Sequence, residues 1–262
     1  MASKTKPYRG TQSVMRAFKI LQTFSDQQPE WRLTELAEEV DLNRTTTYRL
    51  LTALESLDMV TRDEDTQAYR LGSEAIVLGG RALRANYVRQ ISHKELEQLS
   101  AETGETATLD VLEGADTLVV DEVKGRFVLG TMPGAAPAIG TRWPANSSST
   151  GKVLLAWLPP DEGAARLPQP LPQLTPHTIT SREQLQQELA QVRQRGYALA
   201  QDELEIGYSD IAAPLFNHEG DVVAALTVGG ATTRLTAEKR QQAIRLLRDA
   251  ALRVSAQLGH RA

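Results

Sequence analysis

Hydroxyl and guanidinium side chains are concentrated in one short segment of the chain. The segment contributes Arg44, Thr45, Thr46, Thr47, Arg49 and Thr52. Near a helix N-terminus, such side chains suit phosphate oxygens and base edges in the major groove of DNA, which has room for one helix. We predict that Arg44 and Arg49 contact phosphate or guanine, and that Thr45 to Thr47 contact base edges and backbone.

A second hydroxyl-rich segment, residues 146–152, could hold an anion. Its sequence is Asn-Ser-Ser-Ser-Thr-Gly-Lys, and it opens a predicted helix. Hydroxyls and a lysine at a helix N-terminus favour anions. The full phosphate-loop pattern is absent, because the first glycine of GxxxxGK[ST] is missing and Val153 stands where the metal-binding hydroxyl belongs.

Catalytic and metal-binding residues are not predicted. The chain has no cysteine, and its four histidines show no metal-ligand spacing. No GxSxG motif is present, and we interpret Asp202, Glu203 and Glu205 as a solvated loop face. We expect no enzyme, no metal and no cofactor.

The elements that position the Arg44–Thr52 segment are predicted to be a winged helix-turn-helix. A first helix runs from Leu33 to Val40 behind a Thr34 cap, and the second starts at Asn43, an N-cap residue type. The buried stripe of the second helix is predicted to consist of Tyr48, Leu51, Leu54 and Leu57. For Tyr48, this position favours core packing over DNA contact.

A short hairpin follows the second helix. Segments 59–62 and 68–71 flank the polar turn 63–67 and make a two-stranded wing. Helix pairs with a polar face also occur in proteins that never bind DNA, so a small helical bundle is the alternative.

Charge is distributed unevenly around a formal net charge of −4. Residues 1–90 carry 13 basic and 12 acidic side chains, whereas the remainder carries 16 and 21. Five basic residues and no acidic one precede Asp26, which indicates a basic arm before the helix-turn-helix. Basic tails are also common as solubilising ends.

The length of 262 residues suits two domains. A helix over 13–24 packs on the helix-turn-helix, and a further helix over 73–89 connects the domains. The apolar stripe of this connecting helix either docks on its own chain or contacts a second copy. Because we find neither an apolar run near 18 residues nor a signal-peptide pattern, we expect a cytoplasmic protein without membrane contact.

The second domain alternates strands and helices. Residues 92–95 read as a capping box, and 106–112 with 117–123 read as a hairpin. Further strands are predicted at 127–132, 197–200, 211–216 and 222–228, and helices at 153–158, 181–195 and 244–258. An antiparallel sheet flanked by helices, hence an α+β fold, accounts for this order.

These motifs, in this order, resemble the IclR family of bacterial transcriptional regulators over about residues 10–259. The resemblance rests on the segments 17–21 (AFKIL), 45–54 (TTTYRLLTAL), 69–72 (YRLG), 149–156 (STGKVLLA), 195–198 (RGYA), 211–216 (IAAPLF) and 223–228 (VAALTV). Each segment alone is weak evidence for the family, but the order and spacing of all seven segments together are specific.

The resemblance implies a homodimer, often paired into a homotetramer, whose winged helices bind a palindromic operator in double-stranded DNA. It also implies a GAF-like C-terminal domain that holds a small organic effector. Carried over by motif, the effector-binding positions are Ser149, Thr150, Ala200, Asp210, Thr227 and Gly229. Hydroxyl and N–H groups at Ser149 and Thr150 suit a carboxylate effector.

Two positions depart from the family pattern. Ala200 stands where members with small carboxylic effectors often carry an acidic residue, and Asp210 stands where a cysteine or another small residue is common. A carboxylate that faces the pocket would repel an anionic effector and favour a cation, an amine or a hydrogen-bond donor. Alternatively, Asp210 caps the turn after Gly207 and points to solvent.

We predict a winged helix-turn-helix domain at 10–72, a linker helix at 73–90 and a GAF-like effector domain at 91–262. The predicted function is sequence-specific transcriptional regulation controlled by a small effector. As a hypothesis, the linker helix couples the effector site to the spacing of the recognition helices. The alternative is a ligand-binding protein or enzyme with a vestigial winged helix.

Overall fold

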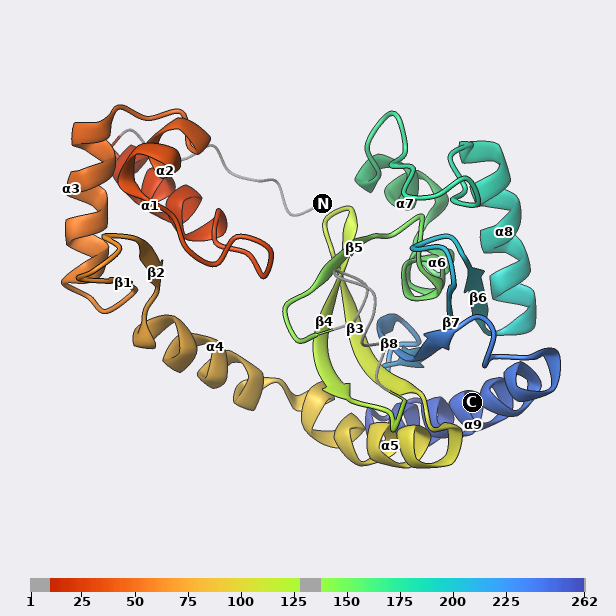
Figure 1. The fold of residues 1–262 in the computed structure, drawn as a ribbon. Helices are drawn as coiled ribbons and strands as arrows, with labels where there is room; N and C mark the ends of the chain where they lie inside the picture. Colours follow the sequence, from red (N-terminus) through yellow and green to blue (C-terminus); the bar gives the residue numbers. More distant parts are fainter. Residues whose placement is uncertain (1–9, 128–137, 262) are drawn as a thin grey trace. The chain divides into compact units, whose positions relative to one another are not determined.

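The computed structural model describes residues 10–127 and 138–261. The chain separates into two compact units, which divide between Ala85 and Asn86 (Figure 1). Among the residues described, no helix has the length and apolar content to cross a membrane.

The first unit is a helix-turn-helix with a two-stranded wing. Its elements are α1 (Gln12–Gln22), α2 (Leu33–Glu39), α3 (Arg44–Glu55), β1 (Val60–Arg62), β2 (Tyr69–Leu71) and α4 (Ser73–Ala85). One core joins the helices to the wing through Ile20, Leu36, Val40, Leu51, Leu54, Val60 and Tyr69. The predicted helices and wing are confirmed.

The helix starts in this unit depend on local hydrogen bonds. The Asn43 side chain accepts a hydrogen bond from the Thr46 N–H at 2.8 Å, so Asn43 is the predicted cap of α3. The predicted Thr34 cap of α2 is wrong. α2 already begins at Leu33, where the Glu35 carboxylate accepts from the Arg32 N–H at 3.1 Å.

The predicted buried stripe of α3 is confirmed in its middle and wrong at its two ends. Leu51 and Leu54 are buried, but Tyr48 is 49% exposed and Leu57, which lies beyond the helix end, is 65% exposed. Thr47 is fully buried in place of Tyr48. The reason is helical geometry, because positions 47, 51 and 54 share a face at spacings of four and three residues.

The predicted linker helix over 73–90 is not continuous. α4 ends at Ala85 and α5 (Tyr87–Thr103) begins after Asn86, whose backbone is extended and whose side chain accepts from the Arg89 N–H at 3.0 Å. An asparagine is a strong N-cap, and here it starts a new helix. The predicted capping box at 92–95 is also wrong, because these residues lie inside α5.

The second unit is built on one antiparallel sheet with the strand order β5-β4-β3-β8-β7-β6. The strands are β3 (Thr106–Glu113), β4 (Asp116–Val123), β5 (Arg142–Pro144), β6 (Ala198–Gln201), β7 (Tyr208–Phe216) and β8 (Val222–Ala231). The predicted hairpin and C-terminal strands are confirmed. Of the strand predicted at 127–132, Phe127 lies in a bend and 128–132 lie outside the described residues.

Helices cover both faces of this sheet (Figure 1). α5 and α9 (Ala237–Gln257) pack on one face, on a core that includes Leu109, Ile211, Leu226 and Leu247. α6 (Ser149–Ala156) packs on the other face, with α8 (Arg182–Arg195) behind it and α7 (Pro160–Arg166) preceding α8 in the chain. Because side chains alternate along a strand, every second residue of β3, β7 and β8 points toward α6.

α6 starts four residues before the predicted helix at 153. The Ser148 hydroxyl caps it by accepting from the Gly151 N–H at 3.1 Å. A Cβ at Gly151 would lie 2.1 Å from the Ala145 carbonyl oxygen, so glycine permits this close approach. The α6 N-terminus is therefore packed inside the domain rather than placed at its surface.

Candidate functional site

The exposed face of α3 carries most of the predicted DNA-contacting residues. Arg44, Thr45 and Arg49 are exposed and Thr46 is half-buried. Thr47 departs from the prediction, because its side chain is buried and its hydroxyl donates to the Asn43 carbonyl at 3.1 Å. This side chain is not available to a base edge in this fold.

Tyr48, rather than Thr47, lies on the exposed face of α3. Its ring is 49% exposed on the same helix as Arg44 and Arg49. Tyr48 was not among the predicted DNA contacts, because its spacing places it on the apolar stripe of the helix. A phenol is amphipathic and can both stack and hydrogen-bond, so Tyr48 joins the candidate interface.

The wing turn is acidic. Asp63 accepts hydrogen bonds from the Asp65 and Thr66 N–H groups at 3.0 and 2.7 Å, and the bonds from Thr66 lower the pKa of its carboxyl. Glu64 and Asp65 are exposed beside it. Because DNA phosphates are negative, the acidic turn is unsuited to contact the DNA backbone. The positive charge that suits phosphate lies on α3.

The second candidate site lies on the sheet face under α6. Asp210 in β7 points at the α6 N-terminus, where its Oδ2 accepts from the Ser149 N–H at 2.8 Å and from the Ser149 hydroxyl. Asp210 is only 3% exposed, so the alternative that it points to solvent is wrong. The carboxylate that occupies the Ser149 donors belongs to the chain itself.

Hydroxyls connect the next strands to α6. The Thr150 and Thr227 hydroxyls lie 2.9 Å apart, and the Thr227 hydroxyl donates to Asp110 Oδ2 at 3.2 Å. The Thr108 hydroxyl donates to the same oxygen at 2.8 Å. The structure thus adds Asp110 to the predicted set. An acidic residue in the strand-like segment 106–112, two positions after Thr108 and so on the same face of the strand, was the signal that could have revealed it.

Both aspartates are buried, each with 3% of its surface exposed. Burial raises the pKa of Asp210 to about 6, against the hydrogen bonds from Ser149, which lower it. Burial, together with the nearby charge of Asp210, raises the pKa of Asp110 to about 7, against the hydrogen bonds from Thr108 and Thr227, which lower it. Each carboxyl therefore changes its proton occupancy near neutral pH.

The two smallest predicted residues flank Asp210 in the sheet. Ala200 pairs with Asp210 from β6, and Gly229 pairs with it from β8. A Cβ at Gly229 would lie 2.0 Å from the Tyr208 phenol oxygen, so glycine makes room for this buried ring. All six predicted effector-binding residues are buried, and all six come from β6, β7, β8 and the first turn of α6.

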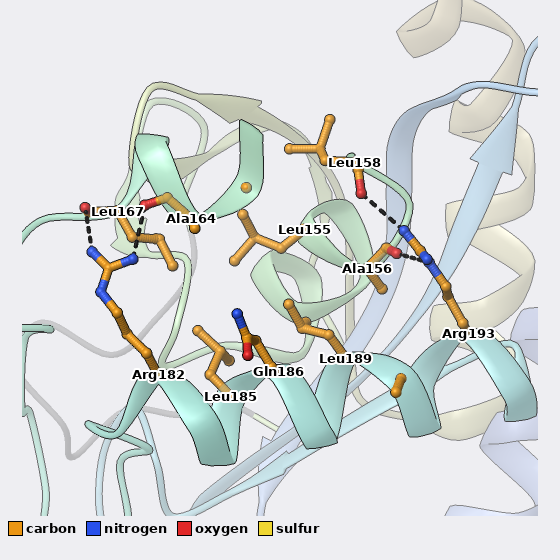
Figure 2. Close-up of a pocket in the computed structure, with 12 residues that line it drawn as sticks. Leu155, Ala156, Leu158, Ala164, Leu167, Arg182, Leu185, Gln186, Leu189 and Arg193 are labelled. Carbon is orange, nitrogen blue, oxygen red and sulfur yellow. Dashed lines mark hydrogen bonds between the residues drawn. The ribbon is translucent and has the colours of Figure 1, made fainter. Parts of the chain in front are cut away.

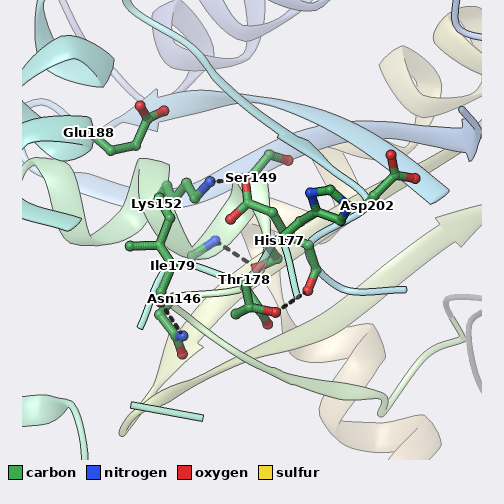
Figure 3. A network of polar contacts seen from close by, with 12 residues as sticks. Asn146, Ser149, Lys152, His177, Thr178, Ile179, Glu188 and Asp202 are labelled. Atoms are coloured by element: carbon green, nitrogen blue, oxygen red, sulfur yellow. Dashed lines mark hydrogen bonds and ion pairs between the residues drawn. The ribbon is translucent and has the colours of Figure 1, made fainter. Parts of the chain in front are cut away.

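A buried ion pair lies beside Asp210. Lys152 Nζ is 2.5 Å from Glu203 Oε1, and the Lys152 side chain is 1% exposed (Figure 3). Burial raises the pKa of Glu203, although Lys152 lowers it. The expectation that Glu203 belongs to a solvated loop face is wrong, because Glu203 is buried and pairs with Lys152 of α6.

The loop before α8 closes over this ion pair. The Thr178 hydroxyl donates to the Glu203 carbonyl at 2.6 Å, and the Asn146 amide donates to the Pro172 and Ile179 carbonyls at 2.9 and 3.0 Å (Figure 3). Backbone and side-chain bonds therefore fix this loop above the sheet face. Within the described ranges, no group of three metal-ligating side chains is assembled.

A cavity of about 350 Å³ lies elsewhere, between α6, α7 and α8 (Figure 2). Its wall is apolar and includes Leu155, Leu185 and Leu189. Arg182 and Arg193 stand at its two ends, but both donate to backbone carbonyls, as in the 2.9 Å bond from Arg182 to Ala164. None of the predicted effector-binding residues lines this cavity.

Comparison with known proteins identifies both units. Residues 13–64 match the IclR helix-turn-helix domain, and residues 80–256 match the C-terminal domain of the bacterial transcriptional regulator IclR. The chain belongs to the IclR family. It is therefore a DNA-binding transcriptional regulator, in a family that is not enzymatic.

Relatives within the IclR family align along almost the whole chain. The transcriptional regulator XynR of Escherichia coli (strain K12) is 33% identical over 95% of this chain and 98% of its own length. A solved IclR regulator from Alicyclobacillus acidocaldarius superposes with a TM-score of 0.82 at 31% identity, covering 94% of this chain and 98% of that chain.

A ligand complex is also known among similar structures. An IclR homologue from Microbacterium hydrocarbonoxydans was solved with 4-hydroxybenzoate, and it matches with a TM-score of 0.79 at 25% identity, covering 94% of this chain and 98% of that chain. An IclR homologue thus binds a small organic molecule.

Proposed function

We propose that this regulator binds an operator through the exposed face of α3 and is controlled by a small organic effector at the sheet face under α6. The observation that carries the DNA part is a capped helix whose first turns expose Arg44, Thr45, Tyr48 and Arg49. The charge on α3 supplies phosphate contacts, and its hydroxyls and phenol reach base edges.

The proposal includes assembly into a dimer on a palindromic operator. Apolar side chains of the first unit are left exposed on two helices, with Phe18 of α1 at 58% and Ile76 of α4 at 78%. Such side chains support a contact with a second copy, and a two-fold pair places two recognition helices on two half-sites. Sedimentation of Ile76→Glu against wild type tests this part, and an unchanged mass would reject it.

Operator binding is tested by mobility shift of DNA from upstream of the coding sequence, at two salt concentrations. We expect Arg49→Ala to weaken binding by roughly 5–150-fold, or about 1–3 kcal/mol, and to lower the salt dependence by about one unit of log–log slope. Arg248→Ala is the matched control, because Arg248 is exposed on α9 in the other unit.

The two outcomes separate the regulator from its alternative. Loss in Arg49→Ala with retention in Arg248→Ala supports DNA recognition by α3. Equal binding by all three proteins, or no shift at any salt concentration, would favour a ligand-binding protein with a vestigial winged helix.

A further inference from the structure

The sheet face under α6 contains two buried acceptors that receive no hydrogen bond from the described residues. These atoms are Asp210 Oδ1 and Glu203 Oε2. Asp210 is 3% exposed and Glu203 is 9% exposed, so bulk water does not satisfy them. A buried acceptor without a donor costs free energy, which a donor from a ligand would recover.

Donors around these acceptors are already engaged. The Ser149 N–H and hydroxyl bind Asp210 Oδ2, and Lys152 binds Glu203 Oε1. The Thr108 and Thr227 hydroxyls donate to Asp110. An incoming carboxylate would have to displace Asp210 from the α6 N-terminus, whereas an incoming donor finds Asp210 Oδ1 ready to accept.

Charge on this face favours the same kind of ligand. Lys152 and Glu203 neutralise one another, and Glu105 forms a separate two-pronged pair with Arg234 at 2.7 and 2.6 Å. Among the described residues, the hydrogen bonds of Asp110 and Asp210 come from threonine and serine, and neither carboxyl forms an ion pair, although the nearby charge of Lys152 lowers the pKa of Asp210. Burial is the main cause of their raised pKa values, about 7 and about 6, and the charge of Asp210 contributes to the rise at Asp110. A cation is the ligand that removes the penalty.

We propose that the effector of this regulator carries an ammonium or another protonated nitrogen group that donates to Asp210 Oδ1, so that the chain senses an organic amine rather than a carboxylic acid. This inference rests on the proposed function for the location of the effector. Asp110 supplies the second negative charge, and Glu203 Oε2 is a second acceptor at the same helix end.

The test uses the full-length protein and matched probes that differ only in charge. One series is 4-hydroxybenzylamine, 4-hydroxybenzyl alcohol and 4-hydroxybenzoate, and a second is butylamine, butanol and butyrate. Calorimetric titration is run above the pKa of both aspartates. We expect an amine to bind at least about tenfold more tightly than its alcohol and carboxylate, which corresponds to about 1.4 kcal/mol.

Variants locate the binding. Asp210→Asn keeps an acceptor for Ser149 and is expected to lower amine affinity at least about tenfold, whereas Asp249→Asn, exposed on α9, leaves it unchanged. Wild type alone gives a second measurement. Near pH 6.5, titration in buffers of different ionisation enthalpy should show proton release, because the cation displaces protons from the two carboxyls.

Each other outcome overturns the inference. It fails if a carboxylate or alcohol binds as tightly as the amine, if Asp210→Asn binds the amine like wild type, or if no amine of either series binds. If a carboxylate binds in an Asp210-dependent way, the effector location survives and the amine class is rejected. If Leu189→Trp in the α7–α8 cavity abolishes probe binding and Asp210→Asn does not, the location in the proposed function is rejected as well.

Discussion

The N-termini of α3 and α6 have similar local chemistry and different surroundings. Asn43 caps α3 and Ser148 caps α6, and both first turns are rich in hydroxyls. At α3 the following side chains Arg44, Thr45 and Arg49 are exposed, whereas at α6 the whole first turn is buried and Ser149 holds Asp210. A helix N-terminus attracts negative charge, but the tertiary fold decides whether that charge is DNA or the chain itself.

The largest difference is expected from the basic side chains that follow each cap. Lys152→Met leaves Glu203 buried without its cation and should lower the free energy of unfolding by about 3 kcal/mol. Arg44→Ala should leave it unchanged within about 0.5 kcal/mol, because Arg44 is exposed. Urea unfolding measures both, with Lys239→Met on α9 as the control. A change below about 1 kcal/mol in Lys152→Met would contradict the buried ion pair as the feature that distinguishes α6 from α3.

The buried face should also make stability depend on pH. Between about pH 4 and pH 7 the folded protein holds a proton on Asp110 that the unfolded chain has released. The free energy of unfolding therefore falls as the pH rises through this range, by about 1–4 kcal/mol. Asp110→Asn should remove this part of the slope and be the more stable protein near pH 8.

Urea titrations at several pH values check this expectation. Asp116→Asn serves as the control because Asp116 is a half-buried aspartate at the start of β4, whereas Asp110 is fully buried in β3. A slope shared by wild type and Asp110→Asn would show that Asp110 ionises in the folded protein as it does in water.

The smallest and sharpest contrast lies within α3 itself. Thr47→Val should cost about 1 kcal/mol of stability through the lost bond to Asn43 and leave DNA affinity per folded molecule unchanged. Thr45→Val should leave stability unchanged and weaken operator binding by about 1 kcal/mol. Thermal unfolding and mobility shift separate the two, and the reversed pattern would contradict the burial of Thr47.

Local patterns in the sequence predicted most of the fold. The Asn43 cap, the wing and the alternating strands depend on neighbours a few residues apart, and the structure has them. The prediction of a continuous linker helix was wrong, because Asn86 caps a new helix within the long apolar stripe. The predictions that Tyr48 is buried and Thr47 exposed were wrong for a different reason. Both positions lie near one edge of the helical face, where a difference of one residue changes which side chain is buried.

The chemistry of the α6 site could be predicted only in part. The family resemblance named Ser149 and Asp210, but their bond joins positions 61 residues apart, and no local pattern reports it. The same holds for Asp110 with Thr227 and for Lys152 with Glu203. The carboxylate at the α6 N-terminus belongs to the chain itself because the fold brings residues distant in sequence together.

Hydrogen–deuterium exchange, measured with and without operator DNA, tests the difference between the two helix starts most directly. We predict slow exchange at Ser149 to Lys152 in the free protein, and slow exchange over the first turns of α3 only when operator DNA is bound. Rapid exchange at Ser149 in the free protein, or exchange in α3 that saturating operator DNA does not slow, would contradict the buried α6 start and the DNA-binding role of α3.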